Sequence, residues 1–183
     1  MSFPIQANLD ALNIAIPSSP TINSINGILR RAAGYLASKV ITLDASGTTQ
    51  NLNCFQITGQ VKCFALYGVV TTAATFTNCT AANFQLYDST APVDLTKNDG
   101  VLSGMAVGTL FGKTTTAATT MSIANNAAGA LIEANWDPFV VNQKTGANTY
   151  LRFTYTTTDA PIAATMTIYC EYYPIGSSTL TAV

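Results

Sequence analysis

One turn-rich stretch of this sequence contains three aspartates, and their spacing resembles a metal site more than that of any other side chains in the sequence. Asp88, Asp94 and Asp99 fall in this stretch, together with Asn98 and Gly100. Calcium takes about six to eight oxygen ligands, which three carboxylates and nearby backbone carbonyls can supply. The spacing does not match an EF-hand loop, however, and aspartate is common in turns because its side chain bonds to nearby backbone N–H groups. We therefore favour ordinary turn residues and predict no metal site.

The sequence offers few groups for side-chain catalysis. It contains no histidine, 8 lysines and arginines and 9 aspartates and glutamates, whereas most catalysis near neutral pH uses histidine or tuned carboxylates and lysines. Serine and threonine are abundant, but no histidine is present to act as their base. We predict a protein that is not an enzyme and binds no cofactor.

The cysteines are scattered along the chain and include no CxxC pair. Without histidine they make a poor zinc site. We expect buried free thiols, because a chain of this length does not depend on disulfides. One or two disulfides are the alternative. The four residues are Cys54, Cys63, Cys79 and Cys170.

A group of aromatic residues raises the possibility of sugar binding, because aromatic faces with Asn and Gln nearby are typical of sugar-binding surfaces. Such a site needs several rings exposed on one sheet face or one loop cluster, which the sequence does not show. Tyrosine is also frequent in strands and subunit contacts, so core and interface positions are the favoured interpretation. The residues are Trp136, Tyr150, Tyr155, Tyr169, Tyr172 and Tyr173.

The composition indicates assembly with other subunits. Charged residues make up 9% of the sequence and the formal net charge is -1, against roughly 25% charged residues in ordinary soluble domains. No basic field exists to attract nucleic acid, and no apolar run is long enough for a membrane helix. The N-terminus lacks the pattern of a secretory signal, so we expect synthesis in the cytosol. A surface this poor in charge is expected to be covered by neighbours, in a homo-oligomer.

From residue 38 onward the apolar residues alternate with a period of two, which predicts strands. We expect about ten short strands and no long helices, hence an all-β fold of the antiparallel β-sandwich type, jelly-roll-like. The turn at 157–161 is expected to join its two flanking strands as a hairpin-like pair. The predicted strands are 39–44, 53–58, 61–67, 83–88, 107–112, 119–124, 130–134, 138–142, 151–155 and 166–172.

The first 23 residues contain Pro4, Pro17 and Pro20 and predict an extended arm. The arm is either a disordered tail or a segment that packs on another subunit, and its aliphatic residues favour packing. We therefore expect the arm to contribute partner-binding residues. They are Ile5, Leu9, Leu12, Ile14 and Ile16.

Residues 24–183 are expected to form a single domain that begins with a short helix near 24–36. Apolar residues follow helical spacing there, and Asn23 or Ser24 can cap the helix. Arg30 and Arg31 are the only clustered positive charges. They form either a solvated helix face or a contact with an acidic partner surface.

Taken together, the sequence resembles the small jelly-roll cement or head-decoration proteins of tailed bacteriophages. The resemblance lies in the N-terminal arm, the run Ile57–Gly68, the stretch Val93–Lys97 and the closing strands from Tyr150 to Pro174. It implies a homotrimer that binds the outer surface of a phage capsid, with the major capsid protein as its partner and the virion surface as its location. The alternatives are a phage fibre or receptor-binding module that recognises glycans, and a secreted carbohydrate-binding domain, which would require export.

Overall fold

The computed structural model describes residues 34–43, 49–72, 79–114, 116–124, 136–157 and 164–183. The chain divides into two units after Gly34, and every described strand belongs to the second unit, Tyr35–Val183. No helix occurs among the described residues, so none of them forms a helix that could span a membrane. The prediction of an all-β fold is confirmed. The strands are β1 (Tyr35–Leu43), β2 (Thr49–Val70), β3 (Cys79–Tyr87), β4 (Pro92–Asp94), β5 (Leu110–Gly112), β6 (Ser122–Ala124), β7 (Phe139–Asn142), β8 (Thr149–Thr157) and β9 (Ala164–Ala182).

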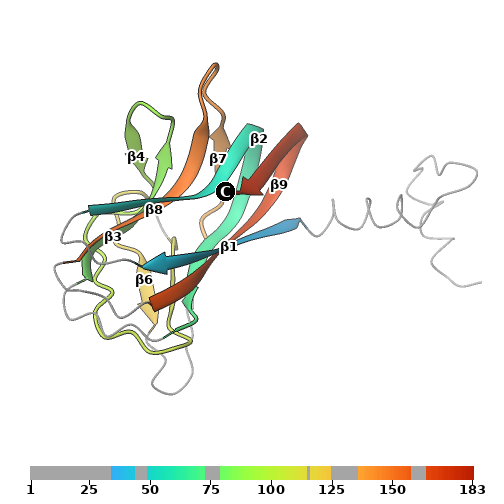
Figure 1. Ribbon diagram of the computed structural model, residues 1–183. Helices are drawn as coiled ribbons and strands as arrows, with labels where there is room; N and C mark the ends of the chain where they lie inside the picture. The colour runs from blue at the N-terminus through green and yellow to red at the C-terminus, as the bar shows by residue number, and fades with distance from the viewer. Residues whose placement is uncertain (1–33, 44–48, 73–78, 115, 125–135, 158–163) are drawn as a thin grey trace, which may run out of the picture. The chain divides into compact units, whose positions relative to one another are not determined.

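All described strand pairs are antiparallel, and they join into one sheet with the order β1-β9-β2-β8-β3-β4 (Figure 1). The 22-residue strand β2 organises this sheet. One edge of β2 pairs with β9, while the other edge pairs in turn with β8, β7 and β5. β6 then pairs with β5. β2 therefore borders four of the other eight described strands.

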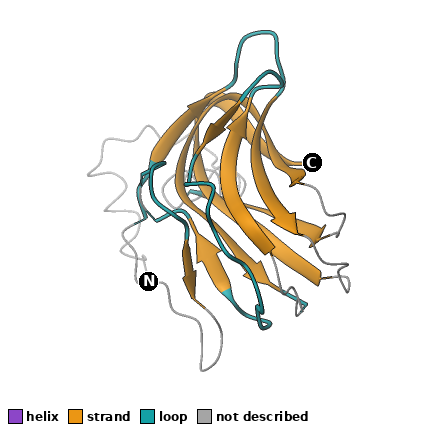
Figure 2. Cartoon of the chain, turned by 90° about the vertical axis from the view of Figure 1, so that its left-hand side faces the viewer, coloured by secondary structure: helices purple, strands orange, loops and turns teal. Residues whose placement is uncertain are grey.

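The sheet curves because β2 is interrupted by bulges (Figure 2). Its register shifts between Asn53 and Phe55, between Thr58 and Gln60, and between Cys63 and Ala65. Bulges bend a strand and increase its twist. This curvature places one face of the sheet inside, as expected of a β-sandwich.

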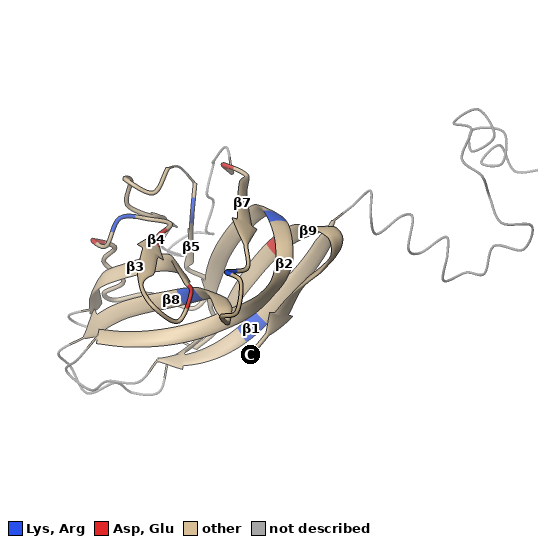
Figure 3. Cartoon of the chain, turned by 90° about the horizontal axis from the view of Figure 1, so that it is seen from above, with Lys and Arg blue, Asp and Glu red and all other residues tan. Residues whose placement is uncertain are grey.

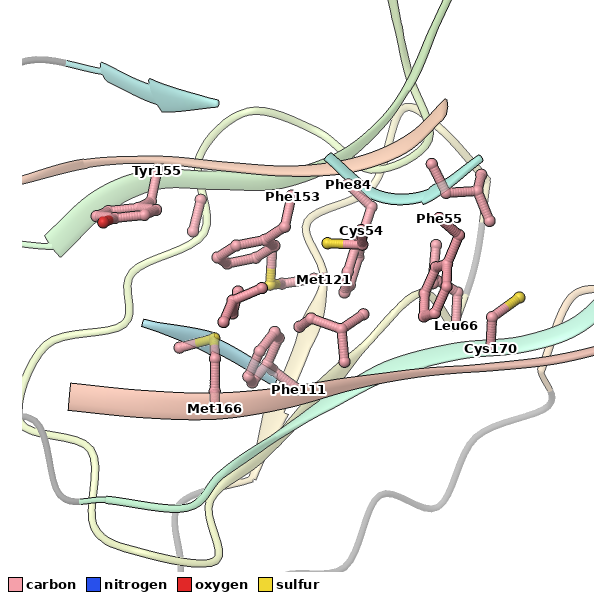
Figure 4. Packing of buried hydrophobic residues seen from close by; sticks show 14 of the residues in the cluster. Cys54, Phe55, Leu66, Phe84, Phe111, Met121, Phe153, Tyr155, Met166 and Cys170 are labelled. Atoms are coloured by element: carbon pink, nitrogen blue, oxygen red, sulfur yellow. The ribbon is translucent and has the colours of Figure 1, made fainter. Parts of the chain in front are cut away.

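The core lies between side chains of β3 and β8 and side chains of β5 and β9 (Figure 4). The ring centroid of Phe153 lies 5.3 Å from that of Phe84 and 5.5 Å from that of Phe111. Gly68 makes room for this cluster, because a Cβ atom at that position would lie 2.1 Å from Cζ of Phe111. The absence of a side chain at Gly68 thus permits the close packing of Phe111 against β2.

Most of the predicted strands are found near their expected positions, and β9 shows the expected alternation. Met166, Ile168 and Cys170 are buried in the core, whereas Glu171 is exposed. The predicted segments 53–58 and 61–67 are parts of one strand, β2, and the short strand β4 was not predicted. The predicted strand 130–134 and the domain boundary after residue 23 lie outside the described residues.

The predicted helix near 24–36 is not observed. Its last two residues, Tyr35 and Leu36, begin β1, and residues 24–33 lie outside the described part of the chain. The reason is long-range pairing, because β1 is bonded to β9 from Tyr35 opposite Tyr172 to Leu43 opposite Ala164.

The expected hairpin between 151–155 and 166–172 is wrong. The strands β8 and β9 that contain these segments do not pair with each other, because β2 lies between them. The turn residues at 157–161 predict pairing between the strands next to them in sequence. In the structure, β2 is long enough to bond to β8 on one edge and to β9 on the other, so it separates the two strands.

Candidate functional site

The predicted partner-binding residues all lie outside the described residues, so their role stays a prediction. This applies to Ile5, Leu9, Leu12, Ile14 and Ile16 of the arm and to Arg30 and Arg31. A candidate site must therefore be sought on the domain that β1 to β9 form.

The three aspartates of the turn-rich stretch have separate partners. Nζ of Lys144 lies 2.8 Å from Oδ2 of Asp88, and Asp88 Oδ1 accepts hydrogen bonds from the backbone N–H groups of Thr90 and Ala91. The bond from Lys144, followed by these backbone bonds, lowers the pKa of Asp88 to about 2. Asp99 pairs with Lys97.

Asp94 in turn accepts hydrogen bonds from the amides of Asn83 and Gln85. Within the described residues, no three histidine, cysteine, aspartate or glutamate side chains form a group that could hold a metal. Ion pairs and hydrogen bonds to neighbouring protein groups account for the described contacts of all three carboxylates.

The four cysteines are free and buried in the structure, as expected. Burial raises the pKa of Cys54 and that of Cys79 to about 12. A thiol with so high a pKa has almost no thiolate at neutral pH and is a poor nucleophile. These two positions serve packing.

The aromatic residues singled out in the sequence do not form one exposed group. Tyr155 is buried in the core, and Tyr172 packs against Tyr35 with their ring centroids 5.5 Å apart. Tyr169 and Trp136 instead flank Tyr67, at ring-centroid distances of 5.1 Å and 5.7 Å. A row of three rings thus forms over β9 and β2.

This aromatic row belongs to a larger surface, which we name the β1–β9–β2 face. It consists of the outward side chains of three adjacent strands, since the neighbouring positions Ile41, Ile168 and Cys170 point into the core. The residues of the face are Leu36, Ser38, Val40 and Thr42 on β1, Thr165, Thr167, Tyr169 and Glu171 on β9, and Tyr67 and Val69 on β2.

Two aliphatic side chains on this face are strongly exposed. Leu36 and Val40 have 61% of their surface accessible, the highest values among the exposed large apolar residues of the described chain. They lie on the same side of β1, four positions apart, with Ser38 between them. Next to them, Tyr169 and Tyr67 are half-buried. The face therefore presents aliphatic and aromatic surface to its surroundings.

The face carries little charge. Glu171 is the one ionisable carboxylate or ammonium group among the residues that define it, and charged positions are sparse over the whole domain (Figure 3). Burial, and then the nearby carboxylate of Glu171, raise the pKa of Tyr67. Tyr67 is therefore a neutral hydrogen-bonding group at physiological pH. Contact with a partner on this face requires the desolvation of few charges.

β1 is also an edge strand, because among the described strands it pairs only with β9. Exposed strand edges can pair with other chains, and an inward-pointing charge is one device that opposes this. Lys39 points to the inner side of β1, as its neighbours Ile41 and Leu43 do. The β1–β9–β2 face is thus suited to contact through side chains more than through extension of the sheet.

Comparisons with models of protein families, with curated proteins and with solved structures give no match for this chain. The chemistry of its surfaces therefore carries the functional argument.

Sequence reasoning singled out Tyr169 of this face but missed Leu36 and Val40. The spacing of apolar residues predicts a helix near 24–36 that includes Leu36, and Val40 falls in the predicted strand 39–44 without an assigned side. Only the pairing of β1 with β9 shows that both point outward. The signal available in the sequence was the run from Tyr35 to Leu43, which is rich in β-branched and aromatic residues and contains one charge.

Proposed function

We propose that this chain is a structural virion protein that binds the outer surface of a bacteriophage capsid and stabilises it. The observation that supports this most directly is the β1–β9–β2 face, an exposed apolar surface with one carboxylate on a chain with 9% charged residues. Patches of this kind mark protein contact sites in soluble proteins. The proposed partners are the major capsid protein and further copies of the chain in a homotrimer.

The apolar side chains of the face supply the binding energy in this proposal. Complete burial of a leucine or valine side chain contributes about 1.5–3 kcal/mol, and most of the surface of Leu36 and Val40 is still available for burial. Tyr67, Tyr169 and Trp136 add rigid aromatic surface with polar edges, which interfaces favour. A few such residues are enough for a specific contact.

The stabilising effect follows from mass action. A protein that binds the assembled capsid and not its separated subunits stabilises the capsid by its binding free energy. Repetition around a symmetric lattice multiplies a modest contact into a large total. The protein then needs no catalytic group, and in this proposal it is made in the host cytoplasm and resides on the virion surface.

The N-terminal arm contributes a second contact in this proposal. Its aliphatic residues, from Ile5 to Ile16, are separated by few charges and can order on a neighbouring subunit. Arg30 and Arg31 provide a polar contact with an acidic partner surface. The arm adds contact area without the burial of many charges.

Co-sedimentation with undecorated capsids of the same virus tests the proposal. We expect saturable binding of the full chain, and a mass by light scattering of three times 19.2 kDa for the free protein. Removal of residues 1–20 should abolish attachment while the far-UV circular dichroism spectrum keeps its β-sheet character.

Two results would contradict parts of the proposal. A full chain that does not co-sediment with the capsids at micromolar concentration rules out the capsid as partner. A truncated chain that binds as well as the full chain removes the arm from the contact and leaves the β1–β9–β2 face and the pair Arg30 and Arg31 as the candidate surfaces.

A further inference from the structure

A second outer surface of the domain has an unusual composition for a sheet. It consists of the side chains of Asn51–Gln56 on β2, Asn83–Tyr87 on β3 and Tyr150–Thr154 on β8 that point away from the aromatic core, and we name it the amide face. Asn51 and Asn53 are exposed and Arg152 is half-buried, whereas Asn83, Gln85 and Thr154 are buried. The register brings them into rows, with Arg152 between Asn53 and Gln85. Asn51 and Asn83 likewise flank Thr154. Side-chain amides thus border β8 on both sides.

These amides are unfavourable choices for the strands that carry them. Asparagine is depleted in strands, on a propensity scale that spans about 1 kcal/mol, whereas much of this chain fills its outward strand positions with threonine. Residues that break a local rule without benefit to packing are typical of functional sites. Asn51 and Asn53 fit this description, because both are exposed.

The centre of the amide face is held rigidly by hydrogen bonds. Nε and Nη2 of Arg152 donate to Oε1 of Gln85 at 3.1 Å and 2.6 Å, and the guanidinium carbon lies 4.2 Å from the ring centroid of Tyr87. The amides of Gln85 and Asn83 each donate to Oδ1 of Asp94 at 2.8 Å. Asn83 and Gln85 are buried and serve to fix the half-buried Arg152. A group fixed in this way loses little entropy when it binds a ligand.

Hydrogen-bonding capacity is left over at the rim of this rigid centre. Neither Asn51 nor Asn53 has a side-chain partner in the part of the chain that the structure describes. Each amide offers two donors and one accepting oxygen. They stand two residues apart on one strand, which spaces them by roughly 6–7 Å. Arg152 lies directly across from Asn53.

The charges of the amide face cancel. Arg152 is the only charged residue in the defining ranges, and its guanidinium is joined through Gln85 to the carboxylate of Asp94 on the neighbouring strand β4 (Figure 3). A neutral surface has no preference for phosphate polymers or other polyanions. Tyr87 and Tyr150, which are opposite each other in the register, add half-buried rings with an apolar body and a polar tip.

We propose that the amide face binds a neutral, hydroxyl-rich polysaccharide. The exposed amides can donate to and accept from adjacent hydroxyls, the guanidinium can donate to them, and the tyrosine rings can contact the C–H faces of sugar rings. The accessible groups, which are the exposed Asn51 and Asn53 and the half-buried Arg152, Tyr87 and Tyr150, extend across three adjacent strands, and such a strip suits an extended chain of sugars. This activity would add attachment to cell-surface glycans to the proposed capsid binding, and it does not depend on that binding.

Affinity electrophoresis of the free, full-length protein in gels that contain dextran, mannan, galactan or the acidic polymer alginate tests this proposal. We expect at least one neutral polysaccharide to retard the protein more than alginate does. The double variant Asn51→Ala with Asn53→Ala should weaken the retardation by at least about tenfold, since it removes two hydrogen-bonding side chains. The matched control is Asn98→Ala with Asn142→Ala, which removes two exposed amides elsewhere and should behave as the parent chain.

Light scattering and thermal unfolding of the same variants complete the test, and an unchanged mass and melting temperature are expected. If the double variant does not fold, Arg152→Lys provides the second test, because it keeps the charge but loses the two-pronged contact with Gln85. The proposal is overturned if none of the neutral polymers retards the parent chain, if alginate retards it most, or if the variants bind as the parent does. A lower oligomer mass for Asn51→Ala with Asn53→Ala would instead identify the amide face as a subunit contact and would also overturn it.

Discussion

Replacement of Leu36 and Val40 by serine should weaken the attachment of this chain to its protein partner while leaving the domain folded. Each side chain has 61% of its surface exposed in the free chain. Full burial of such a side chain contributes about 1.5–3 kcal/mol, so a partner that covers the exposed part gains about 1–2 kcal/mol from each residue. The double substitution should therefore cost about 2–4 kcal/mol, or roughly 30-fold to several-hundred-fold in the dissociation constant.

The stability of the domain should change little, because substitutions at exposed positions away from buried features shift the free energy of unfolding by about 0.5 kcal/mol or less. Val93→Ser with Val101→Ser is the matched control. These two valines are 59% and 56% exposed, and they lie on β4 and in the segment after it, outside the β1–β9–β2 face. The control pair should bind as the parent chain does.

The assay is a co-sedimentation titration with undecorated capsids, combined with light scattering of the free proteins. A dissociation constant within about threefold of the parent value would refute the argument that the β1–β9–β2 face is the capsid contact. Unchanged capsid binding with a lower oligomer mass would assign the face to contacts between copies. Equal weakening in the control pair would show that apolar surface anywhere on the domain promotes binding, which also refutes a specific face.

Three further predictions concern the domain itself. Gly68→Ala should lower the free energy of unfolding in guanidinium chloride by about 1–3 kcal/mol, because the added carbon would lie 2.1 Å from Cζ of Phe111. Phe111→Leu in the same chain should recover part of the lost free energy. A free energy of unfolding that does not fall in Gly68→Ala would contradict the close packing of Phe111 against Gly68. Asp88 should titrate by NMR with a pKa of about 2, below its ordinary 3.8, so its contribution to stability is present above about pH 4 and is lost as the pH falls towards 2. Lys144→Met should raise this pKa, and an unchanged midpoint would exclude the ion pair as its cause. Cys54 and Cys79 each have a pKa of about 12 and should resist Ellman's reagent at about pH 8 until the chain is unfolded. Rapid reaction of these thiols in the native protein would show that they are not buried.

Local pattern predicted where most strands lie. In β9, Met166, Ile168 and Cys170 alternate with more polar residues, and this period of two is a property of any half-buried strand. The length of β2 could not be predicted in the same way, because Gly59 is an ordinary strand breaker in sequence. In the structure Gly59 has a φ of +72° and takes part in a bulge, so the strand continues past it.

The candidate site could not be predicted, because it depends on pairing between distant segments. Leu36 fits the spacing of a helix with Ile25, Ile28 and Leu29, and Gly27 and Gly34 weaken that helix without indicating a strand. Its position opposite Glu171 in β9 decides the matter. Contacts of such long range compete with local propensity and override it. The arm residues and the arginine pair lie outside the described residues, so the sequence remains the only basis for them.

The two proposed surfaces have in common that β2 contributes to both. Its first part carries Asn51 and Asn53 on the amide face, and its last part carries Tyr67 and Val69 on the β1–β9–β2 face. The bulges between these parts each shift the alternation of the strand and bend it, which allows one strand to serve both layers around the core. Substitutions in the first part should therefore affect polysaccharide binding alone, and substitutions on the β1–β9–β2 face should affect capsid attachment alone. If either set of variants impaired both activities with the fold intact, the two surfaces would form one binding site, and the separation argued from the register of β2 would be wrong.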